Sequence, residues 1–227
     1  SALGDEHEPY QPDEQVGSIR HIILATSDLP DEHQCRVTLA IHGPSSPEKV
    51  DGFKARLSAM VDDLEVYVDY LPKRNAGSVS KPTLVFRSSD FRPRIEHQHF
   101  RVSPRSWWTQ TPLSVHGLLK TIRRFAQLAP NDRVLEIGCG VGTVPIMLNR
   151  QDVDWLGIDH ERSAIDDAQY NAQHMNDRSV FRVGDGEHWL RKLAGRTDYS
   201  LLILHAMRLP FGLRFMKLAG AMKPRRL

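Results

Sequence analysis

The chain has 227 residues, 40% of them hydrophobic and 26% charged, which is typical of a folded globular protein rather than a disordered or fibrous one. No apolar run approaches the roughly 20 residues that cross a bilayer. The first residues lack the basic and then apolar order of a signal peptide, and two cysteines cannot form a disulfide framework. These features exclude a membrane-spanning or disulfide-stapled protein, and we expect a cytoplasmic one.

The formal net charge of +2 hides an uneven distribution of charge. Residues 1–19 hold five acidic side chains and no Lys or Arg, so the 30 basic residues stand against the other 23 acids in the rest of the chain. A basic body favours a polyanionic partner, although an excess of this size is also common on surfaces that bind nothing.

The first part of the chain reads as a tail followed by a small α+β domain. Residues 1–15 are acidic and interrupted by prolines, which predicts a flexible tail. After them, apolar residues at helical spacing predict a helix over 48–63, and apolar or alternating runs predict strands at 19–25, 36–41, 64–70 and 83–87. We therefore expect a small α+β domain over residues 16–105.

From residue 106 onward, helices and buried strands alternate. Helical periodicity predicts helices at 113–128, 164–175 and 187–193, and apolar runs predict strands at 133–137, 155–158, 179–183 and 200–204. Alternation at this spacing predicts a Rossmann-like α/β domain over residues 106–227, with a parallel sheet and a ligand at the carboxyl ends of its strands.

A glycine loop follows the first of these strands. Gly138, Gly140 and Gly142 have no Cβ, so the backbone there can reach positive φ and come close to a ligand. A dinucleotide fingerprint would need its third glycine at the position of Thr143, which weakens the NAD interpretation. The alternative is that the glycines only let a helix pack against a strand.

Acidic residues follow the next two strands, and Glu136 precedes the loop. Asp159 stands about 20 residues after the loop, where a carboxylate can bind both ribose hydroxyls, and Asp185 suits an adenine amino group. Together with the glycine loop they resemble the S-adenosylmethionine site of the Rossmann-like methyltransferases. That resemblance implies S-adenosylmethionine as the cofactor, bound by Glu136, the three glycines, Asp159 and Asp185.

Three segments resemble a more specific family. They are Phe100-Arg101-Val102-Ser103-Pro104-Arg105-Ser106-Trp107-Trp108, then Val134-Leu135-Glu136-Ile137-Gly138-Cys139-Gly140-Val141-Gly142, and Ala164-Ile165-Asp166-Asp167-Ala168-Gln169-Tyr170-Asn171-Ala172. They are similar to segments of the RNA uracil-C5 methyltransferases, which make 5-methyluridine in tRNA and ribosomal RNA. The resemblance runs from about Ile19 to Leu227 and implies that family's central domain and most of its catalytic domain.

The chain also departs from that family. Where the family has Phe-Phe-Gln-x-Asn-Pro, this chain has Trp107-Trp108-Thr109-Gln110-Thr111-Pro112, so Gln110 matches only with a shift. Where the family has Asp-Pro-Pro-Arg, this chain has His205-Ala206-Met207-Arg208 and keeps only the arginine. The resemblance implies a cysteine nucleophile that attacks uracil C6. Neither Cys35 nor Cys139 matches it, and we expect that cysteine beyond Leu227.

A basic stretch with aromatic residues, 87–105, suits RNA, because arginine neutralises phosphate and aromatic rings stack on unpaired bases. Arg92, Arg94 and Arg101 are its candidate contacts. The alternative is a solvated strand whose aromatic rings point into the core.

The remaining clusters predict no site. His97, His99 and His116 lack a further ligand at metal-binding spacing, so we expect no metal. The pairs Asp62-Asp63 and Asp166-Asp167 are expected on solvated helix faces.

The leading hypothesis is an S-adenosylmethionine-dependent RNA methyltransferase acting on uracil C5 of tRNA or ribosomal RNA. The altered motif at His205 motivates a second, a non-catalytic relative that binds RNA or a protein. A third, a methyltransferase for a small molecule or a protein, is favoured if the basic aromatic stretch is buried.

Overall fold

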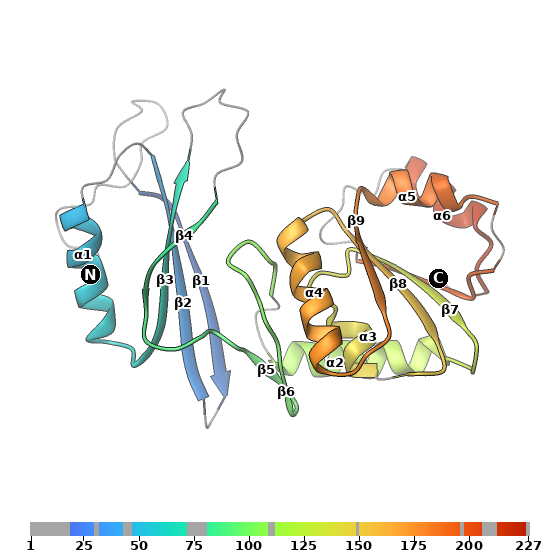
Figure 1. Ribbon diagram of the computed structural model, residues 1–227. Helices are drawn as coiled ribbons and strands as arrows, with labels where there is room; N and C mark the ends of the chain where they lie inside the picture. The colour runs from blue at the N-terminus through green and yellow to red at the C-terminus, as the bar shows by residue number, and fades with distance from the viewer. Residues whose placement is uncertain are drawn as a thin grey trace. The chain divides into compact units, whose positions relative to one another are not determined.

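The structure is a computed structural model that describes residues 19–29, 32–42, 47–71, 81–108, 112–148, 150–195, 198–205 and 213–225. It has two compact units, Ser1–Pro93 and Arg94–Leu227 (Figure 1). The division falls before the boundary expected after residue 105, because residues 101–106 hydrogen-bond to a helix of the second unit. The expected tail, residues 1–15, lies outside the described residues.

The first unit holds a four-stranded sheet of order β1-β2-β3-β4, with one helix packed on it. Its strands β2 and β3 run parallel, and the pairs β1/β2 and β3/β4 run antiparallel. The elements are β1 (Ile19–Leu29), β2 (Glu32–His42), α1 (Pro47–Ser58), β3 (Asp63–Leu71) and β4 (Thr83–Arg87). Alternate strand residues and Phe53 of α1 form its core. Each expected element of this unit is present, with α1 ending earlier than expected.

The second unit holds a parallel sheet of order β10-β7-β8-β9. Helices α2, α3 and α4 cover one face, and α5 and α6 cover the other (Figure 1). The elements are β5 (Arg94–Ile95), β6 (Gln98–His99), α2 (Pro112–Ala126), β7 (Arg133–Ile137), α3 (Thr143–Leu148), β8 (Asp154–Asp159), α4 (Arg162–His174), β9 (Val180–Val183), α5 (Gly186–Leu193), β10 (Leu201–Leu204) and α6 (Leu213–Ala221). The expected Rossmann-like fold is confirmed.

Period-two alternation in β7 explains how one strand serves two cores. Leu135 and Ile137 pack toward α5 and α6, while Val134 packs toward α2 and α3. Glu136 lies on the same side of the strand as Val134 and is also buried.

In the described ranges, no helix is both long and apolar enough to cross a bilayer.

Candidate functional site

The glycine loop lies at the carboxyl end of β7 and is tied to β8. Gly138, Gly140 and Gly142 all have positive φ, at 83°, 56° and 81°. The backbone N–H groups of Gly138 and Cys139 both donate to the carbonyl of Ile158, at 2.7 and 3.1 Å. The loop is therefore a rigid edge beside the end of the neighbouring strand.

Packing within the protein requires a glycine at position 142 and leaves little room for a side chain at position 138. A Cβ on Gly142 would stand 2.9 Å from Phe181 Cζ, and one on Gly138 would stand 3.1 Å from His205 Cβ. The interpretation that the glycines let a helix pack against a strand therefore holds at Gly142, whose Cβ would also stand 3.3 Å from Ala168 of α4, whatever ligand the loop also meets.

Asp159 ends β8 and braces the loop. Its side chain is almost wholly buried. One carboxylate oxygen accepts from the N–H of Gly140 at 2.9 Å, and the other accepts from the N–H of Glu161 at 3.0 Å. The carboxylate thus holds the glycine loop against the start of α4.

Glu136 joins three strands of the sheet from its buried position on β7. Its Oε1 lies 2.7 Å from Nε2 of His205, just after β10, and its Oε2 accepts from the indole N–H of Trp155 on β8 at 2.9 Å. Both carboxylate oxygens are thus satisfied inside the protein. His205 was noted in the sequence only as a departure from the family motif, because a contact between strands distant in sequence leaves no local pattern.

Asp185 stands exposed at the end of β9 and caps helix α5. Its Oδ1 accepts from the N–H of His188 at 2.8 Å. The backbone N–H of Gly184, just before it, donates to the carbonyl of Asp159 at 2.9 Å, so the ends of β8 and β9 are hydrogen-bonded together. The glycine loop, Asp159 and Asp185 therefore share one edge of the sheet, at the carboxyl ends of its strands.

Asp167 of α4 is fully buried, so the expectation that it lies on a solvated face is wrong. Its carboxylate accepts from Arg101 Nε at 2.6 Å, from the N–H and Oγ of Ser103 at 2.6 and 2.9 Å, and from Ser106 Oγ at 2.6 Å. The helical period of the sequence could have predicted this burial, because Asp167 lies on the same side of α4 as the buried residues Ala164 and Ala168. Its neighbour Asp166 is exposed.

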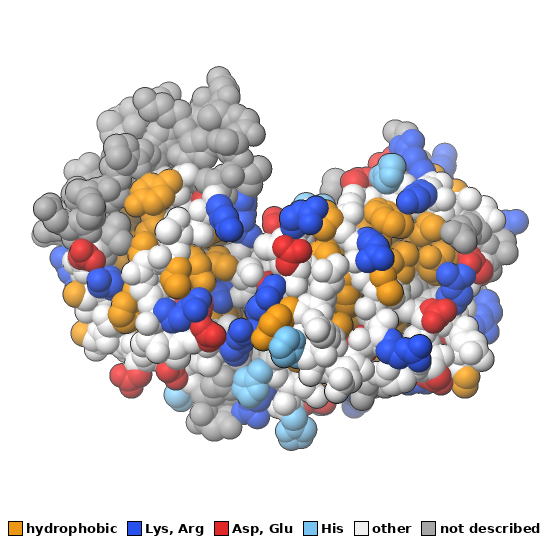
Figure 2. Space-filling view, viewed as in Figure 1, with side chains coloured by type: hydrophobic (Ala, Val, Ile, Leu, Met, Phe, Trp, Pro, Cys, Tyr) orange, Lys and Arg blue, Asp and Glu red, His pale blue; other side chains and the backbone are white. Residues whose placement is uncertain are grey.

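The basic aromatic stretch is only partly available to a ligand. Phe91 and Phe100 are buried, whereas Trp107 is 52% exposed. Basic and acidic side chains are interspersed on the face that Figure 2 shows.

Each of the three candidate arginines has a partner. Arg101 pairs with Asp167, Arg92 lies 3.7 Å from Asp90, and Arg94 donates to the carbonyl of Glu96 at 3.2 Å. Gln110 and Arg208 lie outside the described residues. Among the residues that are described, no group of three or more His, Cys, Asp or Glu side chains could hold a metal ion.

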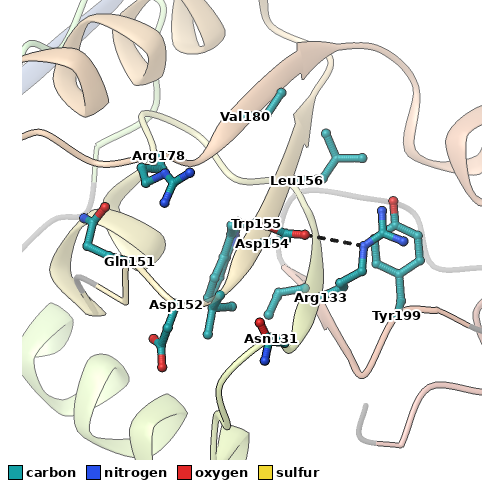
Figure 3. A pocket seen from close by; sticks show the side chains of 12 residues that line it. Asn131, Arg133, Gln151, Asp152, Asp154, Trp155, Leu156, Arg178, Val180 and Tyr199 are labelled. Atoms are coloured by element: carbon teal, nitrogen blue, oxygen red, sulfur yellow. Dashed lines mark ion pairs between the residues drawn. The ribbon is translucent and has the colours of Figure 1, made fainter.

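A pocket of about 470 Å³ opens at the opposite edge of the sheet, at the amino ends of its strands (Figure 3). Arg133 and Asp154 pair across it at 3.9 Å, and Trp155, Arg178 and Tyr199 also line it. Ligands of open parallel sheets bind at the carboxyl ends, so this pocket does not coincide with the candidate site.

The chain matches the model of one protein family over residues 79–196, which is more than half of its length. That family is described as Protein-L-isoaspartate(D-aspartate) O-methyltransferase (PCMT).

Curated relatives match more of the chain. An uncharacterized RNA methyltransferase of Enterococcus faecalis is 25% identical over 187 residues, which are 82% of this chain and 40% of the relative. The 23S rRNA (uracil(747)-C(5))-methyltransferase RlmC of Shewanella baltica is 24% identical over 208 residues, 90% of this chain and 53% of the relative. The chain thus spans about half or less of the length of these relatives.

Among solved structures, the fold is similar to that of the Pyrococcus abyssi tRNA (uracil-54, C5)-methyltransferase in complex with S-adenosyl-L-homocysteine. The TM-score is 0.64 at 18% identity, over 94% of this chain and 50% of that one.

Proposed function

We propose that this chain, which belongs to the methyltransferase family whose model matches residues 79–196 and has RNA methyltransferases among its relatives, binds S-adenosylmethionine and acts in methylating uracil C5 of tRNA or ribosomal RNA. The proposal that the chain binds the cofactor rests on one observation: the glycine loop, Asp159 and Asp185 lie at the same edge of the sheet, at the carboxyl ends of its strands. The RNA half rests on the relatives. An RNA substrate of this kind also supports the cytoplasm as the compartment.

The residues at this edge fit S-adenosylmethionine, which supplies a methyl group on a positively charged sulfonium. Asp185 is exposed and accepts hydrogen bonds, as recognition of an adenine amino group requires. Asp159 is the carboxylate for the ribose hydroxyls, and it also holds Gly140 in place. Gly138, Gly140 and Gly142 present backbone without side chains, and Glu136, just before the loop, is held by Trp155 and His205.

On the substrate side, we keep Gln110 and Arg208 as the residues for the base, and Arg92, Arg94 and Arg101 as contacts to RNA. The guanidinium of Arg101 is bound to Asp167, so its main role is to hold residues 101–106 in place. Carbon C5 of uracil is a poor nucleophile until C6 is occupied, so the reaction needs a thiolate beside the base. Cys139 is buried in the glycine loop and Cys35 lies in the other unit, so neither is proposed for that role.

A protein methyl acceptor is the second candidate. Burial of Phe91 and Phe100 removes two of the rings expected to stack on bases, and the matching family model is described as a protein methyltransferase.

Two measurements test the proposal. Calorimetric titration with S-adenosylhomocysteine should give saturable binding, and no heat or thermal shift at millimolar concentration would rule out the cofactor half. Incubation with labelled S-adenosylmethionine, an unmodified tRNA transcript, ribosomal RNA and a peptide mixture then identifies the acceptor. Label in peptide supports the second candidate. Because neither Cys35 nor Cys139 is proposed as the nucleophile, we expect this chain to bind both cofactor and RNA without forming 5-methyluridine. Label in 5-methyluridine would still support the proposal and would show that one of these two cysteines attacks C6.

A further inference from the structure

Helix α2 presents a side to solvent that the proposed function leaves unused. Its 15 residues include Lys120, Arg123 and Arg124 but no Asp or Glu. Val115, Leu119 and Ala126 are buried on its inner side. The exposed side carries Gly117, Leu118, Lys120, Arg124 and Phe125, which together are called the α2 surface below.

The positive charges of the α2 surface are available to a partner. Within the part of the chain that the structure describes, Lys120 and Arg124 form no ion pair. Arg101, by contrast, is bound to the buried Asp167, and Arg92 faces Asp90. A phosphate would have to compete with a carboxylate at Arg101, whereas at Lys120 or Arg124 it would replace only water and counterions.

An exposed aromatic ring accompanies these charges. Phe125 is 68% exposed, and Leu118, two turns earlier on the same side, is 46% exposed. The guanidinium carbon of Arg124 lies 5.7 Å from the centre of the Phe125 ring. An exposed ring beside a guanidinium that forms no ion pair matches how proteins hold unpaired nucleobases, by stacking the base while a cation meets its phosphate.

Gly117 lies in the middle of α2, where no contact within the protein requires a glycine. A Cβ built at this position meets nothing within 4 Å, and glycine is the poorest helix former after proline. Gly117 is seven residues from Arg124 and three from Lys120, so it shares their side of the helix. A bare stretch of backbone about one turn before Lys120 lets a sugar-phosphate chain approach closely.

We propose that the α2 surface binds RNA, with Lys120 and Arg124 on phosphates, Phe125 stacked on an unpaired base and Gly117 at the closest approach. This inference rests on the proposed function and identifies where its RNA would be bound. It commits to RNA rather than a protein partner because the helix lacks any acidic side chain, and because Lys120 and Arg124 form no ion pair among the described residues.

The experiment measures binding of a fluorescent single-stranded oligouridine and of an unmodified tRNA transcript at several salt concentrations. The double variant Lys120→Gln/Arg124→Gln should lower the salt slope for the oligouridine by about 1.4, or about 0.7 for each lost contact. Phe125→Ala should weaken binding by about 5- to 100-fold and leave the slope unchanged. Gly117→Ala should weaken binding while raising the thermal midpoint by about 2–4 °C, a combination that loss of structure cannot produce.

Two further double variants make the result specific. Lys192→Gln/Lys217→Gln removes the same charge from α5 and α6 and should change neither affinity nor slope. Arg92→Gln/Arg94→Gln tests the other basic stretch. If the α2 variants bind like the unchanged protein, or if the α5/α6 control loses as much, the inference is overturned. A stable dimer broken by Phe125→Ala, with RNA binding intact, would overturn it in favour of a protein partner.

Binding of S-adenosylhomocysteine is measured on every variant and should stay unchanged. If the unchanged protein binds S-adenosylhomocysteine but no RNA at about 50 mM salt, the RNA half of the proposed function fails and this inference fails with it. If RNA binds and only the α2 variants are without effect, the proposed function stands and this inference alone fails.

Discussion

The side chain of Asn171 joins the glycine loop to the segment before α2, because its amide nitrogen donates to the carbonyl of Val141 at 3.1 Å. The same nitrogen donates to the carbonyl of Arg101 at 3.0 Å, and the amide oxygen accepts from the N–H of Arg101 at 2.7 Å. One side chain of α4 thus fixes the backbone of two segments at once. Asp167, one turn earlier, holds the following residues of the same segment. Any movement of residues 101–106 is therefore opposed by α4, the helix that follows Asp159.

Asp167→Asn should destabilise the second unit by about 2–4 kcal/mol, because all groups facing the carboxylate are donors and an amide NH₂ would meet one of them. The matched change Asp166→Asn, on the exposed side of the same helix, should stay within about 0.5 kcal/mol. All four tryptophans lie in the second unit, so urea unfolding followed by tryptophan fluorescence reports on it selectively. Equal effects of the two substitutions would show that the buried network contributes nothing.

Gly142→Ala should cost about 2–4 kcal/mol, because alanine is strained at a φ of 81° and its Cβ would stand 2.9 Å from the Phe181 ring. Gly220→Ala serves as the control, since a Cβ there meets nothing within 4 Å and alanine favours the helix by up to about 1 kcal/mol. The same fluorescence measurement should show stability moving in opposite directions. A neutral Gly142→Ala would mean that the loop can relax, and the packing argument for this glycine would fall.

The sequence predicted the parts of this architecture that depend on local pattern. Apolar runs with period two or 3.6 marked every strand of the parallel sheet and the helices α2, α4 and α5. Asp159 and Asp185 were predicted at strand ends and lie there, because a parallel sheet brings the carboxyl ends of its strands to one edge.

The sequence did not predict the interactions between segments that are far apart along the chain. An Asp side chain is charged, so Asp167 was expected to face solvent. Only the folded chain brings its partners Arg101, Ser103 and Ser106 close to it. The pair of Glu136 and His205 likewise requires β10 to lie beside β7. The short hairpin of β5 and β6 was missed because two residues per strand carry no period.

Asp159→Ala should weaken binding of S-adenosylhomocysteine by about 1–3 kcal/mol, because the ribose loses a charged acceptor and Gly140 loses its brace. Asp154→Ala is its counterpart at the other end of β8. That side chain is 84% exposed, lines the pocket at the amino edge and should leave the affinity unchanged. Calorimetry on both variants decides which edge of the sheet binds the cofactor. A loss of affinity in Asp154→Ala alone would move the site to the pocket of Figure 3.

Neither cysteine of this chain is expected to act as the nucleophile. An RNA containing 5-fluorouracil traps an enzyme of this kind as a covalent adduct. The thiolate attacks C6 of the fluorinated base and C5 is methylated, but the fluorine at C5 cannot leave as a proton does, so the bond between enzyme and base persists. Burial raises the pKa of the Cys35 thiol and so lowers its thiolate fraction at neutral pH, and Cys139 is buried against Gly157 in the glycine loop. With S-adenosylmethionine present, this 227-residue chain should therefore form no adduct with 5-fluorouracil tRNA that survives denaturing electrophoresis. The control is the same incubation with Cys139→Ser. An adduct with the unchanged chain that disappears in Cys139→Ser would identify Cys139 as the nucleophile and contradict its exclusion from that role.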